Sequence, residues 1–139
     1  MNYLKDITEN IESVCRAVPN VNTVYTGNIW DLSTKGDTEY SAMVLDCTGA
    51  DYDIEAGMTS FDFGLFYADI QTDDGNNVLD IQSHAVEVLC NVADKIAQQY
   101  ENIEIEGIQL FEERLSSLCA GAMITFTVTV FHSPDCKWF

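Results

Sequence analysis

The chain has 139 residues, of which 47% are hydrophobic and 11% aromatic, which is enough apolar material for a single folded domain over residues 1–139. Its 23 acidic residues against 6 Lys and Arg give a formal net charge of −17 at pH 7. Such a chain repels DNA phosphates and anionic lipids, which argues against sequence-specific nucleic-acid binding and membrane binding. DNA can still pass along an acidic wall without being held.

Five scattered cysteines without a Cys-x-x-Cys pair are typical of free thiols in a reducing compartment. The start of the chain, MNYLKDITENIESV, lacks the apolar stretch of a secretory signal. No apolar run is long enough to span a bilayer. We therefore expect a protein that is cytoplasmic or is assembled from the cytoplasm.

Apolar residues recur every three or four positions over residues 2–18, which predicts an amphipathic helix ended by Pro19. The β-branched and aromatic run at 21–30 predicts a strand. A largely buried strand is predicted at 40–48, and the acidic segment GADYDIEAG at 49–57 is interpreted as a linker or excursion.

Residues 58–72 alternate with period two, with Phe66 as an apolar exception on the outer face. Helical spacing from Val78 predicts a long helix that ends near Tyr100. The strand predicted at 102–111 changes phase at Gly107, which indicates a bulge. A final strand follows with one apolar and one threonine face. The small residues at 119–122 just before it indicate a bulge or a close approach of another backbone.

This order of helix, three strands, helix and two strands predicts an α+β fold, a mostly antiparallel sheet with two helices packed on one face. The other face would present a mixed surface. Either solvent or a neighbouring subunit would then cover that face. Its predicted residues are Asp62, Phe66, Thr125, Thr127, Thr129 and Phe131.

The loop from Asp73 to Asn77 has two interpretations. A calcium loop of the EF-hand type needs alternating oxygen ligands and a closing glutamate, and Gly75 comes too early for that pattern. A tight turn at Asp74-Gly75 explains the same residues, with Asn77 capping the following helix through its side-chain oxygen and Asp80 in its first turn. We favour the turn.

An acidic divalent-cation-binding module is the alternative function, with Asp51, Asp53, Glu55, Asp73 and Asp74 as its carboxylates. A solvated acidic edge is the simpler interpretation of the first three.

Catalysis has little support, because the only histidines are His84 and His132. Pairing of His132 with Cys136 would give a thiol enzyme or half of a zinc site, and zinc needs more ligands. We predict no enzymatic activity, no cofactor and no metal.

Two stretches resemble structural proteins of tailed bacteriophages, the crAss-like and related gut phages among them. The first is LFYADIQTDDGNNVLDIQSHAVEVLCNVADKI, whose matching positions include Tyr67, Asp69, Asp73 and Asn77. The second is FEERLSSLCAGAMITFTVTV, where the FEER run and the Cys-Ala-Gly run match. One departure is Ile70, where this family usually carries arginine.

This resemblance implies a neck, tail-terminator or tail-completion protein, with a tail-terminator-like sheet flanked by helices. It implies a homo-oligomeric ring, hexameric or dodecameric, between portal and tail, with DNA passing through its lumen. The protein would be part of the virion, assembled in the host cytoplasm, with portal, neck or tail-tube proteins as partners. The predicted subunit-interface residues are Tyr67, Asp69, Asp73, Asn77, Phe111, Glu113, Arg114, Trp138 and Phe139.

Overall fold

The computed structural model describes residues 3–27, 40–70, 77–114 and 118–131. Within these ranges the chain forms two helices and five strands, and it is an α+β protein as predicted. Their bounds are Tyr3–Arg16 (α1), Thr23–Thr26 (β1), Ala42–Asp53 (β2), Met58–Ile70 (β3), Val78–Gln99 (α3), Ile103–Arg114 (β4) and Leu118–Phe131 (β5).

The strands form a single sheet in the order β1-β2-β3-β5-β4. The pairs β2–β3, β3–β5 and β4–β5 are antiparallel, but β1 runs parallel to β2. The sheet is therefore mixed, which corrects the prediction of a mostly antiparallel sheet. Parallel neighbouring strands need a long crossover connection, and Thr26 and Ala42 are far enough apart in the sequence to allow one. The prediction from the sequence did not use this separation.

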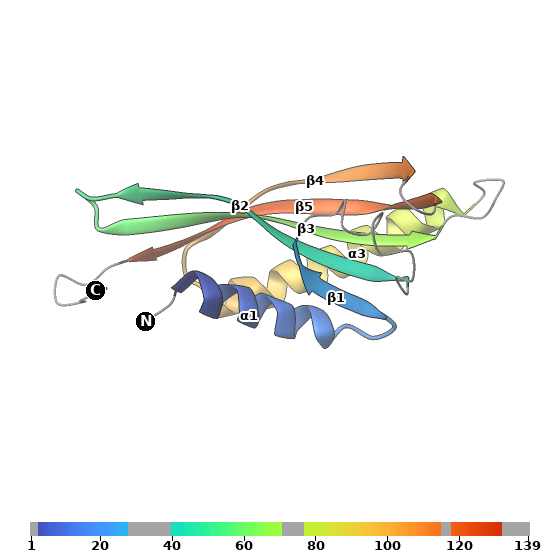
Figure 1. The fold of residues 1–139 in the computed structure, drawn as a ribbon, viewed down its shortest axis with the longest axis horizontal. Helices are drawn as coiled ribbons and strands as arrows, with labels where there is room; N and C mark the ends of the chain where they lie inside the picture. Colours follow the sequence, from blue (N-terminus) through green and yellow to red (C-terminus); the bar gives the residue numbers. More distant parts are fainter. Residues whose placement is uncertain (1–2, 28–39, 71–76, 115–117, 132–139) are drawn as a thin grey trace.

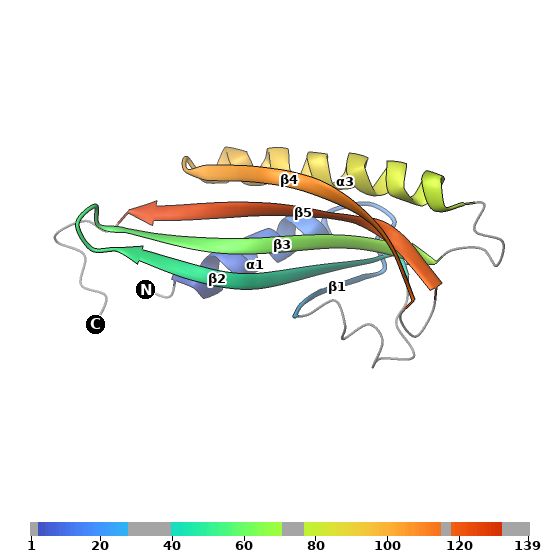
Figure 2. The same ribbon diagram turned by 90° about the horizontal axis from the view of Figure 1, so that it is seen from above.

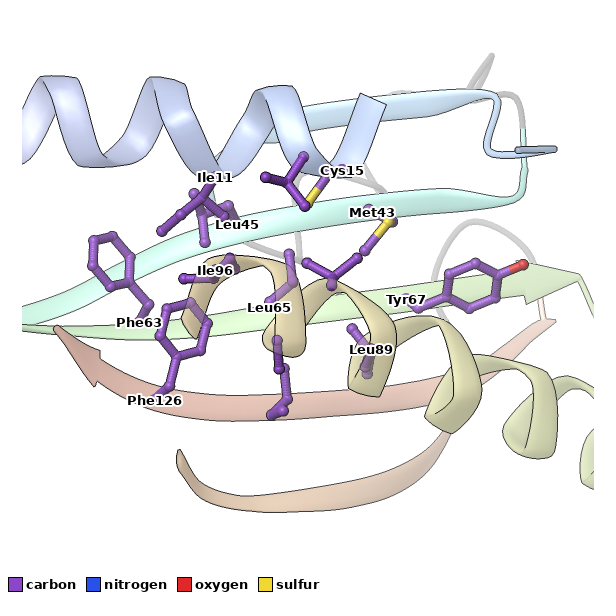
Figure 3. Packing of buried hydrophobic residues seen from close by; sticks show 14 of the residues in the cluster. Ile11, Cys15, Met43, Leu45, Phe63, Leu65, Tyr67, Leu89, Ile96 and Phe126 are labelled. Atoms are coloured by element: carbon purple, nitrogen blue, oxygen red, sulfur yellow. The ribbon is translucent and has the colours of Figure 1, made fainter. Parts of the chain in front are cut away.

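Both helices lie on the same side of the sheet, as predicted (Figure 1). Their apolar stripes meet the inward side chains of the central strands and form the main core (Figure 3). Phe63 and Phe126 stack at its centre with ring centroids 5.4 Å apart. Burying side chains of this size contributes about 1.5–3 kcal/mol each. The helix side of the sheet is therefore a complete hydrophobic core.

Helix α1 shows how narrow this packing stripe is. Ile7, Ile11, Val14 and Cys15 are buried, whereas Leu4, one turn earlier on the predicted stripe, is 37% exposed. The helix therefore docks through its middle and its end, and its first turn contributes little to the core.

Helix α3 begins after Asn77, but the predicted cap is wrong. The Asn77 side chain makes no capping hydrogen bond; its Nδ2 donates instead to the backbone oxygen of Ile70 at 3.2 Å. The backbone N–H of Ile81 donates to the Asn77 oxygen at 2.9 Å and starts the helix. Asn77 therefore ties the start of α3 to the end of β3. Asp80 lies in the first turn, where its charge favours the helix dipole.

Strand β2 is longer than predicted. The segment interpreted as a linker continues the strand to Asp53, opposite β3, and only residues 54–57 turn. Asp53 Oδ1 accepts a hydrogen bond from the Ala56 N–H at 3.0 Å, and Gly57 has φ 65°, which favours glycine. This β2–β3 hairpin extends past both helices (Figure 2). We call residues 50–61 the projecting hairpin.

Two local predictions for the last strands are confirmed. The pairing of β4 with β5 shifts between Ile105 and Gly107, so a bulge lies where the phase changes. A Cβ added at Gly121 would lie 1.7 Å from the Tyr67 backbone oxygen, so the backbones of β5 and β3 approach closely there. Gly121 is thus required by contact with a neighbouring strand.

Candidate subunit interface

The face of the sheet opposite the helices carries its own apolar cluster, at the end where β3 finishes. Ala42, Val44, Ala68 and Cys119 are buried there. Partly buried aromatic residues surround them, including Tyr25, Tyr40, Phe66 and Phe111. The rings of Phe66 and Phe111 meet edge to face with centroids 6.2 Å apart. The expected outward position of Phe66 is confirmed, and its partner is an aromatic residue of β4.

The middle of this open face is polar and acidic. Thr127 donates its hydroxyl hydrogen to a carboxylate and lies 2.7 Å from Asp62 Oδ1 and 3.1 Å from Glu106 Oε1. The hydroxyls of Ser60 and Thr129 are 2.9 Å apart. The predicted threonine row is therefore real, and each of its side chains is partly exposed. The register also places further acidic residues on this face: Asp46, Asp51, Asp53 and Glu104.

The projecting hairpin exposes large apolar side chains at the other end of the sheet. Tyr52 is 63% exposed and Ile54 is 75% exposed. Phe131, at the end of β5 opposite Met58, is 55% exposed. Three such side chains therefore lie at one end of an acidic protein, with Tyr52 on the helix side of the sheet and Phe131 on the open face. Exposed apolar side chains gathered at one end of a protein are typical of contact with another protein.

Positive charge is confined to the helices among the residues whose side chains the structure describes. Lys5, Arg16 and Lys95 all lie on α1 or α3. Lys5 pairs with Glu9 at 3.9 Å, and Arg16 pairs with Glu12 at 3.2 Å. Lys95 has no carboxylate partner within the described ranges. The two sides of the molecule therefore differ in charge, with cations on the helix layer and none described on the open face.

The interface residues predicted on β3 and at the start of α3 lie close together. Tyr67 is a core residue only 3% exposed, with its ring edge-to-face against His84 at 5.6 Å. Asp69 Oδ1 accepts a hydrogen bond from the Ile70 N–H at 2.8 Å. The side chain of Asn77 donates a hydrogen bond to the backbone oxygen of the same residue, Ile70. Burial raises the pKa of the Tyr67 hydroxyl, while a hydrogen bond with Ser41 lowers it.

The interface residues predicted on β4 lie at the same end of the sheet. Phe111 packs on the open face, and its backbone oxygen accepts a hydrogen bond from Gln82 Nε2 at 3.1 Å. Glu113 and Arg114 pair with Cys119 and Leu118 in the β4–β5 ladder. The remaining predicted interface residues, Asp73, Trp138 and Phe139, lie outside the described residues.

The carboxylates of the cation-binding alternative are only partly described. Asp51 and Asp53 share the open face of β2, Glu55 is in the turn, and Asp73 and Asp74 lie outside the described residues. Within the described ranges, no group of three or more His, Cys, Asp or Glu side chains is placed to hold a metal ion.

Two of the described thiols, those of Cys15 and Cys47, are poorly suited to nucleophilic chemistry. Burial, and secondly the charge of Glu12, raise the pKa of the Cys15 thiol to about 12. Burial also raises the pKa of Cys47. A thiol with a raised pKa is a poor nucleophile at neutral pH. His132 and Cys136 lie outside the described residues, so the thiol-enzyme alternative is not tested.

The exposed tip of the hairpin is the feature that sequence reasoning missed. The segment Asp51-Tyr52-Asp53-Ile54-Glu55 alternates acidic and apolar residues, which is the period of a strand. The segment was interpreted as a linker or excursion, and its carboxylates as a solvated acidic edge. This alternation is the signal from which a longer strand could have been predicted, with Tyr52 on one face and Asp51 and Asp53 on the other.

No family model matches this chain, and no curated protein matches it. The resemblance to bacteriophage structural proteins therefore stays a prediction. In the part of the chain that the structure describes, neither helix is long and apolar enough to cross a membrane.

Proposed function

We propose that the chain is a virion structural subunit of a tailed bacteriophage, a head–tail connector or tail-terminator protein without catalytic activity. Copies would join into a hexameric or dodecameric ring between portal and tail. The sequence resemblance supports the phage assignment. The geometry supports a role in assembly.

The observation that carries the assembly role is the projecting hairpin. A β-hairpin that extends beyond the helix layer and exposes Tyr52 and Ile54 leaves apolar area in water in the isolated chain. That area is stabilised when another protein covers it. Neither residue belongs to the clusters that hold the fold together.

The charge of the open face supports a place around DNA. Asp62, Glu106 and the threonine row form an at least partly exposed, acidic surface without a described cation. A channel lined in this way repels phosphates, so DNA moves through it without being bound. The net charge of −17 has the same effect over the whole molecule.

Mass photometry and negative-stain electron microscopy of the purified protein test the proposal. Closed rings of six or twelve copies with a central hole are the expected result. A strict monomer at high protein concentration would contradict it. Genome context gives an independent check, since the proposal expects portal, capsid or tail-tube genes beside this one.

A further inference from the structure

A shallow groove runs between the two helices, on the outer side of the helix layer. It has a volume of about 460 Å³, and its lining residues are Asn10, Ser13, Val14 and Ala17 at α1 and Lys95, Gln98 and Gln99 of α3. Lys95 is the only charged residue of this lining. The groove is therefore a weakly polar site with a single positive charge on a strongly acidic protein.

The projecting hairpin has the opposite character. Its tip presents Tyr52 and Ile54 together with Asp51, Asp53 and Glu55, all of them exposed. Tyr52 pairs with Thr59, so the register places it on the side of the sheet that the helices cover. The hairpin that carries it extends past both helices (Figure 2). The tip thus combines two apolar side chains with three negative charges.

From this complementarity we infer that the projecting hairpin of one copy docks into the α1–α3 groove of a second copy. Tyr52 and Ile54 fill the groove, and Glu55, beside Ile54 in the turn, meets Lys95. The inference rests on the proposed function and adds the contact by which the subunits join.

Geometry favours a second copy over the chain's own groove. The hairpin continues along the sheet past the ends of both helices in both views (Figures 1 and 2), so its tip lies beyond the helix layer of its own chain. Tip and groove are different surfaces of one chain, and their contact is therefore head-to-tail. A head-to-tail contact closes into a ring when its rotation divides a full turn.

Photo-crosslinking identifies the occupant of the groove. A phenylalanine analogue with a photoreactive benzoyl group replaces Tyr52, and this chain is mixed with an isotope-labelled wild-type chain. The expected product joins position 52 to labelled peptides within residues 10–17 or 95–99. Crosslinks of the assembled protein only to other parts of the second copy would overturn the inference.

Charge reversal tests the ionic part of the contact. Lys95→Glu should raise the concentration at which half the chains assemble by about tenfold, as should Ile54→Asp. The double variant Lys95→Glu/Glu55→Lys should recover most of that loss. Glu55 is chosen because Asp53 also shapes the turn. Glu112→Lys, at the far end of β4, changes the net charge as Glu55→Lys does and serves as control.

The outcomes separate this contact from the proposed function. If wild type assembles and the tip and groove variants assemble equally well, only the contact is wrong. If assembly is lost in Lys95→Glu but the double variant does not recover, the pairing of Lys95 with the tip is wrong. If wild type stays monomeric under all conditions, both the contact and the proposed function fail.

Discussion

At the scale of single residues, Gly121 is the position with the least freedom. Its added Cβ would lie 1.7 Å from the Tyr67 oxygen, a backbone atom that cannot move alone. We expect Gly121→Ala to lower the free energy of unfolding by about 3 kcal/mol, the upper end for overpacking in a core. Urea unfolding followed by circular dichroism measures the change.

Gly64→Ala is the matched control for this substitution. Gly64 is also buried in the sheet, but a Cβ there would meet only the side chains of Met123 and Phe66, at 3.6 Å. That is ordinary contact, so we expect a change below about 1 kcal/mol. Equal effects of the two substitutions would show that the close approach of β3 and β5 is not the cause.

Cys15 makes the stability depend on pH in the alkaline range. Its pKa of about 12 in the folded chain is above the value of 9.0 for a free thiol. The folded state therefore keeps a proton that the unfolded state loses, and this contribution is complete below pH 9 and is lost as pH rises toward 12. We expect wild type to lose about 2 kcal/mol more than Cys15→Ala between pH 8 and pH 10.5.

Urea titrations of both proteins at the two pH values measure this difference. Alkaline titration of buried tyrosines such as Tyr67 acts equally on wild type and variant, so it cancels in the comparison. Equal losses in the two proteins would contradict the assigned role of the thiol.

At the scale of elements, α1 is held by few contacts. Ile11 is 0% exposed and lies at the middle of the helix, against β2 and α3 (Figure 3). We expect Ile11→Ala to cost about 3 kcal/mol of stability and Leu4→Ala less than about 1 kcal/mol. Chemical denaturation of the two variants measures this. A larger loss in Leu4→Ala would show that α1 docks through its first turn.

The elements also show what a sequence can predict. Helical periodicity placed both helices, because each buries one stripe of apolar residues against the sheet. The phase change at Gly107 and the small residues before Ala122 were local signals, and both were confirmed. The direction of a strand relative to its neighbour depends on the whole sheet and not on the local sequence, so no direction was predicted for β1. The acidic segment Asp51–Glu55 was interpreted as part of a linker or excursion, whereas β2 continues to Asp53. A strand that extends past the core needs no apolar face, so its high charge did not exclude a strand.

The candidate site was less predictable for the same reason. A residue belongs to an interface because it contacts another protein, and the isolated chain does not contain that protein. An apolar residue that would contact a second subunit therefore cannot be told from a core residue by its sequence pattern. Tyr67 shows this, since it was predicted to lie in a subunit interface and is 3% exposed in the isolated chain. Asn77 was expected to serve its own helix and instead bonds to β3.

At the scale of the whole molecule, the charge of −17 opposes any assembly of identical copies. Screening weakens this repulsion, since the Debye length falls from about 10 Å at 0.1 M salt to about 3 Å at 1 M. A single ion pair at Lys95 is worth at most about 1 kcal/mol and does not reverse the trend. We therefore expect assembly to strengthen about tenfold or more between 0.05 and 0.5 M NaCl.

Sedimentation velocity at the two salt concentrations measures this effect. Glycerol at matched viscosity is the control for changes in the solvent that are not ionic. Weaker assembly in high salt would mean that ion pairs, and not apolar surface, hold the copies together.

Native mass spectrometry of the 139-residue chain tests most directly whether it uses its exposed apolar residues to join copies of itself. We predict one discrete species of six or twelve copies, which Ile54→Asp shifts toward monomer at the same chain concentration without loss of fold. A wild-type chain that remains a monomer at every concentration and salt would contradict the account.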